Sequence, residues 1–196
     1  MPDEYFAKPL RNESISEVAY AWREAFGIGP YLQFVDILKI VENVLPVLFP
    51  PFSLIVEKAS ALDNVEAYTE FEPPAIVVRE NVYQAAVRRD GRARWTFAHE
   101  LGHLTLHDSA VPLARAPQQY QRMQDLPAYA STEKQADKFA ASFLMPEWIV
   151  ESFSCPIALS SACGVSYQAA KIRIEQLARK DRSYLPDAVK RYIGQK

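Results

Sequence analysis

The spacing of apolar and polar positions divides the first half of the chain into two helical segments followed by extended ones. Apolar residues recur at helical spacing in both early segments, and Gly27 and Pro46 stand where these helices should end. Runs rich in β-branched and aromatic residues, one of them alternating, then predict three strands. The expected helices span 14–26 and 34–45, and the expected strands span 52–57, 65–71 and 75–79.

The second half of the chain is predicted to be helical. Residues 97, 101 and 104 keep helical spacing in a helix that could open at Thr96 or at the arginine-rich turn before it. Residues 108–130 contain three prolines and a glutamine-rich run, which predicts a mobile loop that could wall a cleft. The expected helices span 94–107, 132–145, 147–153 and 166–180.

These elements predict the α+β fold class. We expect a mostly helical domain with a small mixed or antiparallel sheet of about three strands packed on the helix at 94–107. The boundaries that we predict are an N-terminal segment at 1–13, a domain at 14–165 and a basic helical segment at 166–196. A length of 196 residues suits one domain with a small appendage, and an apolar content of 49% argues against disorder.

Five consecutive residues, His99-Glu100-Leu101-Gly102-His103, match the pattern H-E-x-x-H. A helix advances about 100° per residue, so the second histidine returns to within about 40° of the first and both can bind one metal ion. The glutamate lies to one side, where it can take a proton from metal-bound water. The plain alternative is a polar helix face that happens to carry these residues. The glycine either admits another segment near the metal or allows close helix packing.

A third ligand is needed because hydrolytic zinc usually takes three protein donors and leaves one position for water. Glu133 is the best candidate, since it lies on the apolar stripe of the helix at 132–145, which a capping box of Thr132 and Gln135 should open. A carboxylate that points at the core needs a partner, and a metal ion is a good one. The alternative is a first-turn glutamate that the helix dipole favours.

Further side chains could support such a site. Asp137, one turn after the candidate third ligand, could accept the second ring N–H of either motif histidine. His107 is not expected as a ligand, because three consecutive helical turns cannot easily converge on one ion. Its ring either packs half-buried under the site or hydrogen-bonds to the site or the substrate carbonyl. Tyr120 and Tyr129 are further candidate donors to that carbonyl.

Three stretches resemble the ImmA/IrrE family of metallopeptidases. Residues 94–107 resemble the metal-site helix of that family, and residues 133–140 with Leu144-Met145-Pro146 resemble its second block. Residues 164–174 resemble its helical close. The family usually has asparagine where this chain has Asp137, which leaves the role of this residue open.

The resemblance implies a zincin-like fold that binds one Zn²⁺ ion. Glu133 stands where the family has its third ligand, beside His99 and His103, and Glu100 takes the place of the general base. It also implies a cytoplasmic bacterial or phage endopeptidase that cleaves a helix-turn-helix (XRE-type) repressor in gene regulation or stress response. The residues alone predict metal-assisted hydrolysis of a substrate.

Two other classes of protein stay open. One is a catalytically silent binding module of the same fold that sequesters a repressor or a toxin–antitoxin partner. The other is a DNA-binding regulator that uses the C-terminal helices, where Gly164-Val165-Ser166 resembles a helix-turn-helix turn. In zincins an edge strand pairs with extended substrate. Ile76-Val77-Val78 is the candidate for that role here, and a buried central strand is the alternative.

Composition and charge limit these classes further. No stretch approaches ~18–20 uninterrupted apolar residues, so a membrane-spanning helix is not expected, and the acidic start of the chain is unlike a secretory signal. Cys155 and Cys163 are too few to staple a fold and are typical of free thiols in a reducing compartment. The net charge of −2 gives no global reason to expect nucleic-acid binding.

Basic residues are unevenly distributed along the chain. Residues 171–196 carry a local charge of +5, which could contact DNA or an acidic partner, although a solvated surface is the plainer interpretation. A second group of arginines before the metal-site helix could steer an acidic substrate or merely lie at a turn. The arginines of this second group are Arg88, Arg89, Arg92 and Arg94.

Overall fold

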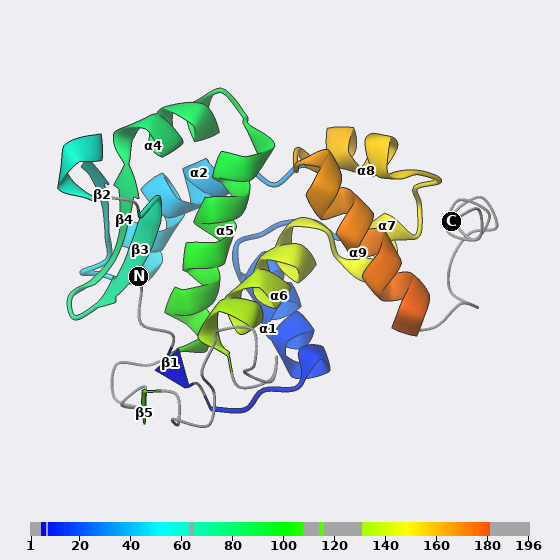
Figure 1. Cartoon of the computed structure of the whole chain (residues 1–196), viewed down its shortest axis with the longest axis horizontal. Coiled ribbons are helices and arrows are strands. Elements are labelled where there is room, and N and C mark those ends of the chain that lie inside the picture. Colours follow the sequence, from blue (N-terminus) through cyan, green and yellow to red (C-terminus); the bar gives the residue numbers. More distant parts are fainter. Residues whose placement is uncertain (1–4, 7, 63–64, 108–113, 116–130, 181–196) are drawn as a thin grey trace.

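The computed structural model describes residues 5–6, 8–62, 65–107, 114–115 and 131–180. It shows a mostly helical α+β domain with a small sheet at one side, which confirms the predicted fold class (Figure 1). The helices are α1 (Asn12–Ala25), α2 (Ile37–Lys39), the π-helix η1 (Ile40–Val44), α3 (Leu45–Leu48), the 3₁₀ helix η2 (Ala59–Ala61), α4 (Glu80–Val87), α5 (Gly91–Leu106), α6 (Thr132–Leu144), α7 (Glu147–Val150), α8 (Pro156–Cys163) and α9 (Tyr167–Lys180). The strands are β1 (Tyr5–Phe6), β2 (Ser53–Glu57), β3 (Ala67–Phe71), β4 (Pro74–Arg79) and β5 (Ala114–Arg115).

The main sheet has the order β2-β4-β3, and β1 pairs separately with β5. In the main sheet β2 runs parallel to β4, and β3 runs antiparallel to it. The centre of β4, Ile76-Val77-Val78, is therefore buried with at most 2% of each residue exposed. The prediction that this segment is a substrate-binding edge strand is wrong, and the alternative of a buried strand is confirmed. The edge strand that contacts α5 is β3.

The observed helices begin and end close to their predicted bounds, with two informative exceptions. The segment expected as one helix at 34–45 begins at Ile37, widens into the π-helix η1, and continues through Pro46 as α3. The predicted stop at Pro46 is wrong, because the helical backbone continues through this proline in the first turn of α3. The short helices α4 and α8 are not among the predicted elements.

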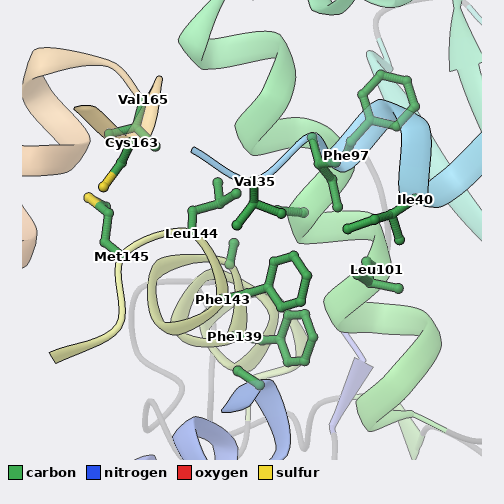
Figure 2. Packing of buried hydrophobic residues seen from close by; sticks show 14 of the residues in the cluster. Val35, Ile40, Phe97, Leu101, Phe139, Phe143, Leu144, Met145, Cys163 and Val165 are labelled. Atoms are coloured by element: carbon green, nitrogen blue, oxygen red, sulfur yellow. The ribbon is translucent and has the colours of Figure 1, made fainter. Parts of the chain in front are cut away.

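The core lies where α5 packs between the sheet and α6, and α1 covers the other side of α6. Figure 2 shows buried side chains that α5 and α6 contribute to this core, among them Phe97, Leu101, Phe139 and Phe143. The two α6 rings are stacked with centroids 5.7 Å apart. Each such side chain stabilises the fold by about 1.5–3 kcal/mol relative to exposure. The apolar face of α9 adds Ala170, Ile174 and Ala178 to the same core.

Arg94 is a buried structural residue. Its guanidinium donates to the carbonyls of Gly164, Val35 and Cys163 at 2.8, 2.7 and 3.2 Å, and lies 3.8 Å from the ring centroid of Phe34. Burial lowers the pKa of Arg94 to about 10, which leaves it charged at neutral pH. The expectation that this arginine steers a substrate or decorates an exposed turn is wrong, because only 2% of it is exposed.

The two cysteines are free thiols, as predicted. Cys163 is buried, and burial raises the pKa of its thiol to about 11. Within the described residues, none of the helices combines the length and the apolar character needed to cross a membrane.

Candidate metal centre

The motif lies in the C-terminal half of α5, which starts three residues before the predicted start at 94. The carboxylate of Asp90 caps it by accepting from the backbone N–H groups of Arg92 and Ala93 at 3.0 and 2.9 Å. The predicted start at Thr96 is therefore wrong, whereas a start at the arginine-rich turn is close to the observed one. The helix stops before His107, whose backbone is extended.

The helix α6 presents Glu133 from its first turn. Its N-cap is Ser131, whose hydroxyl accepts from the backbone N–H of Lys134 at 3.2 Å. The predicted cap at Thr132 is thus one residue late. Glu133 follows the cap by two positions. Its side chain therefore lies at the N-terminal end of α6, which faces the motif.

Three donor atoms converge between the two helices. The Nε2 atoms of His99 and His103 lie 3.0 Å apart. Oε2 of Glu133 lies 3.2 Å from Nε2 of His99, and Oε1 of Glu133 lies 3.4 Å from Nε2 of His103. Two ligands of a tetrahedral zinc ion, each about 2.0–2.1 Å from it, are separated by roughly 3.3–3.4 Å. The nitrogens and the carboxylate are thus close enough together to share one zinc ion.

The protons in this cluster favour a cation at its centre. Asp137 lies 3.0 Å from Nδ1 of His99, and a carboxylate can only accept, so Nδ1 carries the proton of the neutral ring. In that neutral form Nε2 of His99 would point a lone pair at the carboxylate of Glu133. Lone pairs that face one another repel unless a proton or a metal ion lies between them. Two imidazoles and one carboxylate form a donor set that zinc accepts.

The pKa values of His99 and Glu133 are shifted by the close contact between imidazole and carboxylate groups. Burial lowers the pKa of His99, but hydrogen bonds to the carboxylates of Asp137 and Glu133 outweigh it and raise the pKa to about 10. Hydrogen bonds with His103 and His99 hold the pKa of Glu133 far below its usual range. The electrostatics of the cluster thus favour positive charge at this position.

Glu100 lies beside the donor cluster and is fixed by a neighbouring strand. Only 6% of it is exposed. The hydroxyl of Thr69, in the middle of β3, lies 2.8 Å from Oε2 of Glu100 and 3.1 Å from its backbone oxygen. This hydroxyl can donate to the carboxylate and limit its rotation. The motif does not predict Thr69. The available signal is that strand alternation places it between Ala67 and Phe71 on one face, where a hydroxyl needs a partner.

Gly102 is the point of closest approach between α5 and α6. A Cβ atom at this position would lie 3.1 Å from the Cα and carbonyl oxygen of Ala136 and 3.2 Å from Cβ of Phe139. The two interpretations of this glycine therefore coincide. The helix that packs closely against it is the one that carries Glu133 to the histidines.

His107 lies next to the cluster without joining it. Its ring centroid is 5.3 Å from that of His103, and 8% of the residue is exposed. Burial, helped by the neighbouring His103, lowers the pKa of His107 to about 4, so its ring is neutral at ordinary pH. The predicted loop at 108–130, apart from β5, lies outside the described residues. The carbonyl-donor candidates Tyr120 and Tyr129 lie outside them too.

The fold and the site thus define a class of protein. It is a zincin-like α+β domain with a His-His-Glu cluster that is compatible with a metal ion. Residues 63–175 match the model of the peptidase family described as the IrrE N-terminal-like domain. The match spans more than half of the chain, so the chain belongs to this family, and the predicted resemblance is confirmed.

One solved structure with a similar fold is a Mycobacterium tuberculosis transcriptional regulator. The two chains superpose with a TM-score of 0.53 at 14% sequence identity, over 83% of this chain and 46% of that one. The chain therefore spans about half the length of that regulator, and the likeness concerns the fold. No curated protein matches the chain.

Proposed function

We propose that this protein is a zinc-dependent endopeptidase in which His99, His103 and Glu133 hold one ion and Glu100 is the general base. The observation that carries the proposal is the convergence of two imidazole nitrogens, 3.0 Å apart, and the carboxylate of Glu133 beside the buried carboxylate of Glu100. Membership in a peptidase family supports the same class of reaction. A module that only binds its partner has no need of Glu100.

Different residues have different roles in the proposed peptide hydrolysis. When bound, the ion supplies Lewis acidity to a water molecule and to the scissile carbonyl. Glu100 takes a proton from that water and delivers it to the leaving amine, while the hydroxyl of Thr69 keeps the carboxylate in position. Asp137 holds the proton on Nδ1 of His99, so that Nε2 faces the site as a lone-pair donor.

The substrate that we propose is a helix-turn-helix (XRE-type) repressor in the cytoplasm of a bacterium or of a phage-infected cell. The resemblance to ImmA/IrrE metallopeptidases supports this choice. A structural neighbour described as a transcriptional regulator is compatible with it. Cleavage of the repressor would switch on regulatory or stress-response genes.

Two substitutions separate metal binding from turnover. Glu100→Gln should keep the metal and lose cleavage, because it removes the proton acceptor and leaves the three donors. His103→Ala should lose both, because it removes one donor. Metal content by mass spectrometry and intact mass of a neighbouring-gene repressor after incubation measure the two properties.

His107→Ala is the matched control, since it removes a histidine of the same segment from outside the donor cluster, and it should retain the metal. Full metal occupancy in His103→Ala would contradict the ligand assignment. A stable one-to-one complex with no fragment in the wild type would instead indicate a sequestering module.

A further inference from the structure

A groove of about 680 Å³ begins beside the candidate metal centre and runs between α5, α6 and α9. Asp137 joins the two features, because it lines the groove and also lies 3.0 Å from Nδ1 of His99. The indole N–H of Trp95, another lining residue, donates to the same carboxylate at 3.4 Å. The groove therefore begins on the side of His99 that faces Asp137, next to the donor cluster.

The floor of the groove is apolar. Its side chains come from all three helices, and Ile172 of α9 is 42% exposed although it is a large hydrophobic residue. Burial of such surface by a partner is favourable at about 25 cal/mol per Å². The apolar lining residues are Trp95, Ala141, Ala169, Ile172 and Leu177.

Positive charge surrounds this floor. Five lining residues are basic, whereas Asp137 is the one acidic residue that lines the groove in the described part of the chain. This local excess contrasts with the net charge of −2 of the whole chain. The basic residues are Arg92, Lys134, Lys138, Arg173 and Arg179.

Two of these arginines show how the charge is available to a partner. Arg92 forms an ion pair with Glu66 at 2.7 Å, but 77% of the arginine side chain is exposed and the pair is correspondingly weak. Arg173 is buried, and its Nε donates to the carbonyl of Met145 at 3.0 Å. Its guanidinium also interacts with Tyr20 and Glu147, so the four other basic residues supply most of the charge that a partner meets.

We propose that this groove binds an acidic segment of the protein substrate that also carries apolar side chains, next to the bond to be cleaved. The inference rests on the proposed function, whose substrate class it specifies. Charge complementarity selects an anionic partner, and the apolar floor selects a peptide over a nucleic acid. A phosphate backbone would leave the apolar side chains Ile172 and Leu177 uncovered.

A titration tests the groove without any need for turnover. The full chain is titrated into a fluorescein-labelled peptide of alternating glutamate and leucine, and into a matched lysine–leucine peptide, with anisotropy as the readout. Lys138→Glu and Arg179→Glu, alone and together, reverse charge at the groove. Lys39→Glu makes the same change on an exposed side chain of α2 outside it.

The acidic peptide should bind and the basic one should not. The double variant should weaken binding of the acidic peptide at least about tenfold, whereas Lys39→Glu should leave it within about twofold. Equal losses in both variants, or failure of the acidic peptide to bind, would overturn the inference. So would a fluorescent duplex DNA that binds more tightly than the peptide at physiological salt and is lost in the same variants.

A cleavage profile separates the groove from the peptidase activity. Wild type digesting a proteome-derived peptide library should cut next to segments enriched in Asp and Glu on one side of the bond, and Lys138→Glu should reduce that enrichment. Cleavage without acidic enrichment would overturn the groove inference while leaving the peptidase intact. Absence of all cleavage would overturn the proposed function, and the titration would still decide the groove.

Discussion

At the scale of single residues, the site joins a short local motif to contacts that are distant in sequence. His99, Glu100 and His103 can be predicted because four-residue spacing on one helix fixes their relation. Glu133 can be predicted as a carboxylate on an apolar stripe. Thr69 cannot be found in this way, because its hydrogen bond to Glu100 spans 31 positions and depends on how β3 packs on α5.

The hydroxyl of Thr69 gives a residue-scale prediction. Thr69→Val keeps the shape of the side chain and removes the donor to Glu100, so kcat should fall about 10–100-fold. Metal content and KM should change little, because no metal donor is altered. Thr69→Ser restores the hydroxyl and should recover kcat to within a few-fold. Equal kcat values in the valine and serine variants would show that the hydroxyl does not position Glu100.

At the scale of helices and strands, glycine and proline at helix ends explain which element bounds could be predicted from the sequence. Elements without such local signals could not be predicted from it. Gly27, with a φ of +68°, ends α1 as predicted. The missed helix α8 also carries recognisable signals, a proline in its first turn and Gly164 in the left-handed conformation at its end. The π-helix at Ile40–Val44 has no comparable local signal, and neither does the central position of β4, which depends on strand pairing across the sheet.

The close contact of α5 with α6 at Gly102 gives an element-scale prediction. Gly102→Val should push the two helices apart, because its Cβ alone would press on backbone atoms of Ala136. We expect the free energy of unfolding to fall by about 1–3 kcal/mol and metal affinity to fall as Glu133 moves away. Gly29→Val is the control, since nothing lies within 4 Å of a Cβ there. Unchanged metal affinity in a folded Gly102→Val protein would contradict this role of the contact.

At the scale of the whole molecule, Arg94 ties the helix that carries the motif to the turn between α8 and α9. Its bonds to carbonyls of Gly164, Val35 and Cys163 join segments that no local pattern relates. An arginine in a basic cluster suggests a surface, and only the packed structure shows that this one is internal. The predicted boundary at 165/166 stays a prediction, although α9 shares the core of the domain.

Arg94 and its exposed neighbour Arg92 form a matched pair for a stability measurement. Arg94→Gln should lower the free energy of unfolding by about 2–4 kcal/mol, because it leaves buried carbonyls without donors. Arg92→Gln removes an exposed ion pair with Glu66 and should cost no more than about 1 kcal/mol. Chemical denaturation followed by circular dichroism measures both. Similar losses for the two variants would contradict the structural role of Arg94.

The donor cluster also has a consequence for folding, because its members belong to α5 and α6, which are far apart along the chain. An ion that binds only the native arrangement stabilises it by about 2.7 kcal/mol at a concentration 100 times its Kd. Removal of metal by EDTA should therefore lower Tm, added zinc should restore it, and His103→Ala should respond to neither. A Tm that does not change with zinc concentration would contradict this coupling of metal binding to folding. A Tm that rises with zinc would mean that the ion acts as a reversible cross-link between α5 and α6. The zinc supply would then govern how long the protein survives in the cell.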